Sequence, residues 1–582
     1  MTLHLRPTIT HRFSVSEVIS SYPDAEAAFS DGNYVVAATL APSGSALQGA
    51  SQIMAGAFPE GLATLDALPE IPARFQIYRA FAQWALGDHE GALLTLTPRL
   101  TEAPAAAFAT LLGSAQLDVL LFADPFQRSV EAFRKVPHFR VHTVGFDSGC
   151  DIRIRPDDDL TATVTAALGK TPDLAITLTC YASYHRDYGR LPCPKIGFMT
   201  DHDYFLYNRD AFAANDLLLV NGPVEHFEVR RLYPRPCHTY YTLDLDYQIP
   251  HGKGTPAREK RFDIGLSGSS FVPYMREKAQ FALSLMDLPD DLRVRIVQGF
   301  LPGDAYAKFI GESRLMPVAV RFSDVLNTRA IESIQQGCAA FHPAGNLWPA
   351  LLGLESHCHG YRYEALEDDT RLALAATPDD KPIDLAAIDA ILPPSPEREA
   401  RFLKYFAFLG CLQSTGGGTK PLPAPASGAT GILLELQKRT GETATAFYEQ
   451  QIAYFSRGTT AHDALKGLNA GIYLCRQLPF PDLVARVADL GEEAVQRFPT
   501  HLALRFNLAR FLYHHNQMDR AEQQFMAILE AGEEHVLAPE TDDILNYHYH
   551  IEYFPFMTYQ DQALLKLVGQ RDPRHAKPFC EP

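Results

Sequence analysis

The sequence predicts an α/β core of two parallel sheets, flanked at both ends of the chain by helical regions. Short apolar runs bounded by turn residues recur at helix-length spacing in the middle of the chain, and the series restarts after a polar stretch at 250–261. Segments rich in Ala and Leu, with regularly spaced small residues, stand before and after this part. Continuous apolar strands separated by helices are typical of buried parallel sheets.

Composition narrows the class of protein. The 582 residues suggest about four domains. A net charge of −17 argues against a general nucleic-acid binder, which needs a basic surface to neutralise phosphates. The nine cysteines form no CxxC pair, so buried free thiols are expected rather than a zinc or redox motif. Neither a signal peptide nor a run of about 18 apolar residues is evident, which predicts a cytoplasmic protein without a transmembrane segment.

Residues 1–113 are predicted to be helical and tetratricopeptide-like. Three pairs of small residues stand five positions apart: Gly32 and Ala37, Gly56 and Gly61, and Gly87 and Ala92. A glycine reverses the chain between two antiparallel helices, and the second small residue allows those helices to approach closely. A plain helical bundle is the alternative.

Residues 114–248 are predicted to form the first doubly wound domain. Its strands are expected at LDVLLFA (117–123), FRVHTVGF (139–146), DLAITL (173–178), KIGFMT (195–200), DLLLVN (216–221) and CHTYY (237–241). The intervening stretches are long enough for crossover helices.

Residues 249–414 are predicted to form a second domain of the same kind. Its strands are expected at FDIGLSG (262–268), RVRIVQG (293–299), RLMPVAV (314–320) and CAAFHP (338–343). Two such domains place a cleft between them, lined by the carboxyl ends of their strands. A segment rich in Gly and Pro, 414–428, is expected to be a flexible connection.

Residues 429–582 are predicted to be helical, with one clear tetratricopeptide-like repeat. Ala509 is followed by Ala521 and Phe525 at spacings of 12 and 16, which are small and aromatic positions of such a helix pair. Pro499 falls where a repeat usually ends. A plain helical bundle is again the alternative.

A serine-rich loop after the first strand of the second domain predicts a phosphate site. The loop contains Ser267, Gly268, Ser269 and Ser270, and a helix-compatible sequence follows. Glycine permits close backbone approach, and free N–H groups at a helix start favour an anion. The alternatives are a purely structural strand–helix joint and a degenerate G-x-S-x-G hydrolase elbow.

A second candidate site lies at 326–346, where a helix is expected to open near Arg329 and to end at Gly337. Arg329 can donate to a diphosphate in bidentate geometry, and Glu332, one turn later, can accept from the two hydroxyls of a ribose. An exposed ion pair on a helix face is the alternative. Three further residues of this segment are assigned to the same nucleotide-sugar site: Asn327, Thr328 and His342.

These features resemble the GT-B glycosyltransferases, with two Rossmann-like domains. They are most similar to the spore-protein-like (glycosyl transferase group 1-like) type, whose second domain carries an R-x-x-E-x-x-x-x-G element, here Arg329, Glu332 and Gly337. The resemblance covers roughly residues 115–412. It implies that the first domain presents the acceptor and the second holds the donor nucleotide, at Ser267, Gly268, Arg329 and Glu332.

Glycosyl transfer needs a base that deprotonates the acceptor hydroxyl. Asp201 and His202 follow the strand at 195–200 and are the candidates for this role, whereas turn capping by Asp201 and Asp203 is the alternative. The triplet 201–203 also matches the DxD metal motif of another glycosyltransferase fold. Because that fold has a single nucleotide-binding sheet, we expect no essential metal and no cofactor besides the donor.

The leading functional hypothesis is a nucleotide-sugar-dependent glycosyltransferase. Helical repeats form concave surfaces suited to polypeptide, which suggests a protein acceptor such as a bacterial surface or flagellar protein. The alternative is a non-catalytic interaction scaffold with a degenerate transferase core. The nucleotide base, the sugar, the stereochemical outcome and the oligomeric state are not encoded in readable motifs.

Overall fold

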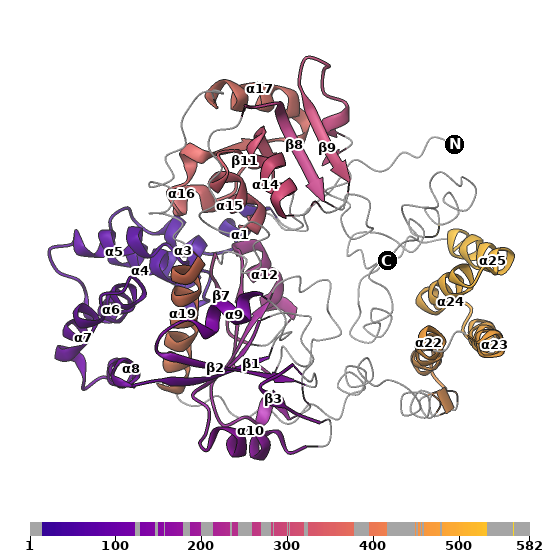
Figure 1. Ribbon diagram of the computed structural model, residues 1–582, viewed down its shortest axis with the longest axis horizontal. Coiled ribbons are helices and arrows are strands. Elements are labelled where there is room, and N and C mark those ends of the chain that lie inside the picture. Colours follow the sequence, from indigo (N-terminus) through magenta and orange to yellow (C-terminus); the bar gives the residue numbers. More distant parts are fainter. Residues whose placement is uncertain are drawn as a thin grey trace. The chain divides into compact units, whose positions relative to one another are not determined.

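The computed structural model divides into two compact units (Figure 1). The described residues of the first unit end at 415, and those of the second unit begin at 449. The described residues are 14–122, 128–145, 149–155, 158–178, 185, 187–199, 214–232, 235–241, 259–268, 281–282, 284–298, 301, 303–318, 324–377, 395–415, 449, 452–453, 456, 459–477, 480–531 and 563. Within this part of the chain, no helix is both long and apolar enough to span a bilayer.

The first unit opens with a series of short helices. They are α1 (Val15–Ser20), α2 (Ala25–Ser30), α3 (Tyr34–Leu40), α4 (Ala46–Met54), α5 (Phe58–Asp66), α6 (Gln76–Ala85), α7 (His89–Leu96) and α8 (Ala103–Gly113). Most begin after a residue whose side chain accepts a backbone N–H of the first turn, which is the usual reason for a helix to start there. Such N-caps are Ser14, Asp24, Asn33, Ser45 and Asp88.

The predicted glycine turns are confirmed. Gly32, Gly56 and Gly87 all have positive φ, between +83° and +100°, a conformation that favours glycine. The predicted close approach is clearest at Gly61, where a Cβ would lie 2.6 Å from the carbonyl oxygen of Gly49. The helices α4 and α5 therefore pack backbone against backbone at this crossing.

The first sheet is entirely parallel, with strand order β3-β2-β1-β4-β5-β6-β7. All six predicted strands are present, and the two-residue β3 is the addition. The strands are β1 (Leu117–Phe122), β2 (Phe139–Gly145), β3 (Ile152–Arg153), β4 (Leu174–Thr177), β5 (Lys195–Met199), β6 (Leu217–Val220) and β7 (Cys237–Thr239). The helices that follow strands here are α9 (Arg128–Arg134), α10 (Leu160–Leu168) and α12 (Pro223–Leu232).

The second sheet is also parallel, with strand order β12-β11-β10-β8-β9. The predicted restart of the strand series is confirmed, and among the described residues of this domain β12 is the one strand that the sequence did not predict. The strands are β8 (Phe262–Gly268), β9 (Val294–Gln298), β10 (Ser313–Pro317), β11 (Ala339–Pro343) and β12 (Cys358–Tyr361). Its helices are α14 (Gly303–Gly311), α15 (Thr328–Gln335), α16 (Trp348–Leu351) and α17 (Leu366–Ala376).

A long helix, α19 (Ser395–Thr415), follows the second sheet in sequence but packs on β4 and β5 of the first sheet and on α6 and α8. Phe408 of α19 stacks on Phe81 of α6, with ring centroids 4.2 Å apart. Although residues up to 414 were assigned to the second domain, this helix thus lies against the first sheet. The domain boundaries themselves stay predictions.

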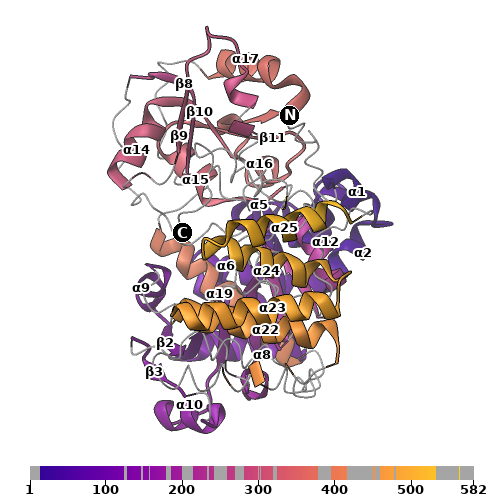
Figure 2. The same ribbon diagram turned by 90° about the vertical axis from the view of Figure 1, so that its right-hand side faces the viewer.

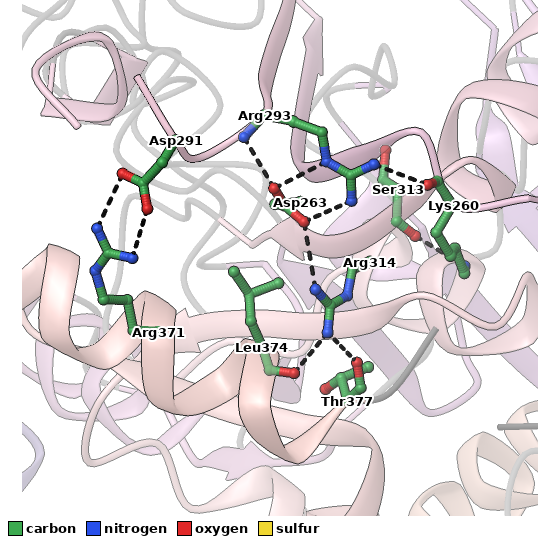
Figure 3. A network of polar contacts seen from close by, with 9 residues as sticks. All are labelled: Lys260, Asp263, Asp291, Arg293, Ser313, Arg314, Arg371, Leu374 and Thr377. Atoms are coloured by element: carbon green, nitrogen blue, oxygen red, sulfur yellow. Dashed lines mark hydrogen bonds and ion pairs between the residues drawn. The ribbon is translucent and has the colours of Figure 1, made fainter. Parts of the chain in front are cut away.

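The amino edge of the second sheet is held by an ion network (Figure 3). Asp263 in β8 accepts from Arg293 (Nη2 to Oδ1, 2.8 Å) and from Arg314 (Nη1 to Oδ1, 3.3 Å). Arg314 also donates to the carbonyl oxygens of Leu374 and Thr377, at 2.6 Å each. This network closes one edge of the sheet, so the opposite, carboxyl edge is where a ligand is expected.

The second unit contains α22 (Ala461–Gln477), α23 (Pro481–Arg497), α24 (Leu502–His514) and α25 (Met518–Leu529), each packed against the next (Figure 2). Three positions predicted from the repeat pattern, Ala509, Ala521 and Phe525, are fully buried. Ala509 and Ala521 allow α24 and α25 to lie close, as the pattern predicts. Together, the two parallel α/β sheets and the flanking helices confirm the predicted fold class.

Candidate functional site

Several predicted site residues gather at the carboxyl edge of the second sheet. Because β8, β10 and β11 are parallel, their carboxyl ends lie along the same edge. Ser267 and Gly268 end β8, and His342 is the fourth residue of β11. The helix α15 connects β10 to β11, so its first turn also lies at this edge.

The predicted helix at Arg329 is present and runs from Thr328 to Gln335. Asn327 is its N-cap: its side-chain Oδ1 accepts the backbone N–H of Ala330 at 3.1 Å. Gly337, predicted to end the helix, has a φ of +71°. Asn327 therefore has a structural role in α15 in addition to the ligand role predicted for it.

Arg329 and Glu332 both lie near a side chain that the sequence did not reveal, Tyr306 of α14. Burial raises the pKa of Tyr306, the nearby Arg329 cation partly offsets this effect, and the nearby Glu332 carboxylate adds to it. Glu332 is itself 2% exposed, which contradicts the alternative of an exposed ion pair on a helix face. A tyrosine in the first turn of the helix after β9 was the available signal.

Ser267 faces the same side of the second sheet as α14. Side chains of a strand alternate, so Ser267 points to the same face as Gly265. A Cβ at Gly265 would lie 3.0 Å from Cζ of Phe309 in α14, which identifies that face. Since α14 runs back from the carboxyl edge, its first turn, with Tyr306, lies farther along β8 toward Ser267. Ser267 thus points to the face of the sheet covered by α14, and Tyr306 of that helix lies near Arg329 and Glu332.

His342 is a buried histidine at the same edge. Its Nδ1–H donates to the carbonyl oxygen of Pro343 at 2.9 Å, and its ring lies 5.2 Å from the Trp348 ring between centroids. Burial lowers the pKa of His342, which favours the neutral form. In that tautomer, Nε2 is an acceptor and suits a hydroxyl group rather than a phosphate.

The carboxyl edges of the two sheets contact each other near α15. Tyr241, which follows β7, donates its hydroxyl hydrogen to Oδ2 of Asp324 at 2.6 Å. Asn221, directly after β6, donates from Nδ2 to the carbonyl oxygen of Leu326 at 2.7 Å. Burial raises the pKa of Asp324 to about 6 although its carboxylate accepts three hydrogen bonds. None of these contacts was predicted.

Four predicted site residues lie outside the described residues: Asp201, His202, Ser269 and Ser270. Their predicted roles as base and as phosphate loop stay predictions. Among the residues that the structure describes, no group of three or more His, Cys, Asp or Glu side chains is arranged to hold a metal ion.

Comparison with known proteins gives two findings. A tetratricopeptide repeat family model matches residues 485–537, which include α24 and α25. Among solved structures, the chain is similar to a mutant of the Thermobaculum terrenum O-GlcNAc transferase, with 13% identity and a TM-score of 0.30, over 70% of this chain and 100% of that one. A likeness at this level assigns neither a fold nor an activity. No curated protein matched the sequence.

Proposed function

We propose that this chain is a glycosyltransferase of the GT-B type that uses a nucleotide-sugar donor. The observation that carries the proposal is that Arg329 and Glu332 both lie near Tyr306 of α14, the helix on the face of the second sheet toward which Ser267 points. An arginine, a carboxylate and a strand-end serine at the carboxyl edge of a parallel sheet suit a nucleoside diphosphate. The spore-protein-like type remains part of this proposal.

The donor is held as follows. The guanidinium of Arg329 and the backbone N–H groups of the Ser267–Ser270 loop bind the diphosphate, and Glu332 accepts from the ribose hydroxyls. Arg329 also neutralises the charge that develops on the leaving diphosphate during sugar transfer. Asn327 and Thr328, at the start of α15, also bind the nucleotide sugar, and His342 accepts from a hydroxyl of the sugar. No metal takes part.

The acceptor is activated from the first domain. Asp201 or His202 removes the proton of the attacking hydroxyl as general base. The helical repeats supply a platform for a polypeptide acceptor, such as a bacterial surface or flagellar protein, since stacked repeats form extended concave surfaces.

A non-catalytic scaffold is the second candidate, and the tetratricopeptide match at 485–537 favours it, since such repeats bind proteins. Melting temperatures measured with UDP-, GDP-, CMP- and dTDP-sugars separate the two, together with nucleotide release. A transferase is stabilised by one class of donor and releases its nucleotide, and Arg329→Ala loses both effects. The matched control is Arg371→Ala, which removes an arginine on α17 paired with Asp291. A chain indifferent to every donor is a scaffold.

A further inference from the structure

Asp324 is a completely buried carboxylate three residues before the N-cap of α15. Its φ is +60°, a left-handed conformation that aspartate adopts more readily than most residues. Its backbone N–H donates to Oδ1 of Asn346 at 3.1 Å. Its own Oδ1 accepts the backbone N–H groups of Leu347 at 2.7 Å and Trp348 at 3.2 Å. These contacts fix Asp324 within the second half of the core.

The other oxygen of the Asp324 carboxylate, Oδ2, accepts a hydrogen bond from a residue next to the first sheet. Tyr241 donates to Oδ2 at 2.6 Å, and this tyrosine is also buried. The backbone N–H of Tyr241 donates in turn to the carbonyl oxygen of Ala55, at the end of α4, at 3.0 Å. One carboxylate therefore connects the second half to β7 and to the N-terminal helices.

Two neighbouring contacts hold the same segment against β6. Nδ2 of Asn221 donates to the carbonyl oxygen of Leu326 at 2.7 Å. Gly222 lies so close that a Cβ there would be 2.4 Å from the carbonyl oxygen of Asp324. The segment from Asp324 to Leu326 is thus held at the carboxyl edge of the first sheet by two hydrogen bonds and one close backbone approach.

The segment from Asp324 to Leu326 leads directly into Asn327, the N-cap of α15, and this helix carries the proposed donor site. Consecutive Cα atoms lie about 3.8 Å apart, so a displacement of Asp324 is passed on to Asn327 and the first turn of α15. Leu326, Ala330 and Ile331 are fully buried and belong to the same continuous apolar core as the first sheet. The place of Arg329 therefore depends on the place of Asp324.

We propose that Asp324 and Tyr241 are positioning residues for the donor site. Their hydrogen bond holds the start of α15 in a fixed place relative to the first sheet, and so aligns Arg329 and Glu332 with the half that presents the acceptor. The proposal rests on the proposed function for what α15 binds. Neither side chain touches the donor; both act through α15, and small misplacements of such groups are costly in transfer reactions.

The test uses the full-length chain with three single substitutions. Tyr241→Phe removes the donor to Oδ2, and Asp324→Asn replaces an acceptor oxygen with an amide that cannot accept from all three partners. Gly222→Ala places a methyl group against the Asp324 carbonyl by an independent route. The matched control is Tyr405→Phe, which removes an equally buried hydroxyl whose partner is the carbonyl oxygen of Met54.

Two quantities are measured where all variants are folded: amide hydrogen exchange of α15, and affinity for UDP, GDP, CMP and dTDP by calorimetric titration. We expect the three substitutions to speed exchange of the α15 amides while leaving β8 and β9 as in the original chain. We also expect the three substitutions to raise the Kd of the nucleotide that the chain binds by about tenfold. Tyr405→Phe is expected to change neither the exchange of α15 nor the nucleotide affinity, even if its melting temperature falls as much as that of the three test variants.

The positioning role is overturned if α15 exchanges no faster in Tyr241→Phe and Gly222→Ala than in the Tyr405→Phe control. It is also overturned if α15 exchanges faster but nucleotide affinity stays unchanged. Arg329→Ala is included so that the two proposals fail separately. If none of the four nucleotides binds, or if Arg329→Ala binds as the original chain does, the proposed donor site is wrong, while hydrogen exchange still decides whether Asp324 and Tyr241 hold α15.

Discussion

Asp118 and Asp263 occupy the same position in two different sheets. Each is the second residue of its strand, β1 or β8. Asp118 binds Arg140 on the neighbouring strand β2, and Asp263 binds Arg293, which directly precedes the neighbouring strand β9. Nη2 of Arg140 lies 2.6 Å from Oδ2 of Asp118, and Nη2 of Arg293 lies 2.8 Å from Oδ1 of Asp263. In both sheets, an aspartate–arginine ion pair thus joins two neighbouring chain segments at the amino ends of the strands.

These two pairs are expected to stabilise the fold without affecting ligand binding. Asp118→Asn and Asp263→Asn each remove charge-assisted hydrogen bonds, so the free energy of unfolding should fall by about 1–3 kcal/mol in urea denaturation. Nucleotide affinity should stay unchanged, because the candidate site lies at the opposite edge. Asp291→Asn, which breaks the exposed pair with Arg371, should lower the free energy of unfolding far less, because solvent screens exposed ion pairs. A loss of nucleotide binding in Asp263→Asn would contradict this division between the edges.

Asp324 should make the protein less stable as the pH rises from about 4 to 6. Its folded-state pKa is raised to about 6 by burial, so the folded chain holds this proton more tightly than the unfolded chain. The stability that this proton contributes is fully present below the unfolded pKa of about 3.9 and is lost as the pH rises through the folded pKa. At about 1.4 kcal/mol per pKa unit, the free energy of unfolding changes by roughly 3 kcal/mol.

The measurement is urea denaturation of the original chain and of Asp324→Asn between pH 4 and 7. All other groups titrate alike in both proteins, so the difference in unfolding free energy isolates Asp324. The original chain should lose stability relative to Asp324→Asn toward pH 6 and then stay level. A difference that is flat, or that grows in the other direction, would show that the carboxylate is ionised without penalty.

Two glycines of the N-terminal helices should respond differently to alanine. Gly61→Ala places a methyl group 2.6 Å from the carbonyl oxygen of Gly49 and 2.8 Å from the backbone nitrogen of Ile53, and backbone atoms cannot easily give way. We expect a loss of about 1–3 kcal/mol in unfolding free energy. Gly87→Ala meets no atom within 4 Å but keeps a φ of +97°, which should cost about 1–2 kcal/mol.

Gly113→Ala is the control for both changes. Gly113 is the last residue of α8 and has an ordinary helical backbone, and a Cβ added there would meet no atom within 4 Å. Alanine at this position should therefore be neutral or slightly stabilising. Chemical denaturation of the three variants checks the order. If Gly61→Ala is as stable as Gly113→Ala, the close packing of α4 and α5 is wrong.

Local patterns were enough to predict most of the fold. The apolar runs at β1, β4, β6 and β8 are long and bounded by turn residues, so they identify buried strands, and the second series of runs identifies a second sheet. The strand β3 has two residues and β12 reads CHGY, so neither has an apolar pattern to detect. The return of α19 to the first sheet is decided by packing partners far away in sequence, such as Phe81, which stacks on Phe408.

The site was predictable only where its residues are close in sequence. Arg329 and Glu332 share one helical turn, and the Gly337 signal gives the end of that helix. Tyr306 comes from another helix, and Tyr241 reaches Asp324 across 83 residues. Contacts of this kind depend on which strand edges meet, and no spacing rule in a single sequence encodes that.

Glu332 should give the chain a preference for ribonucleotides. If this carboxylate accepts from the ribose hydroxyls, UDP or GDP should bind about tenfold more tightly than its 2′-deoxy counterpart, since one hydrogen bond to a charged group contributes about 1.5–3 kcal/mol. Glu332→Gln keeps the shape but accepts as a neutral amide, so the preference should fall severalfold. Glu364→Gln, an exposed change in the same half, should keep it. Calorimetric titration with each nucleotide and its deoxy form measures both ratios, and an unchanged ratio in Glu332→Gln would remove Glu332 from the ribose site.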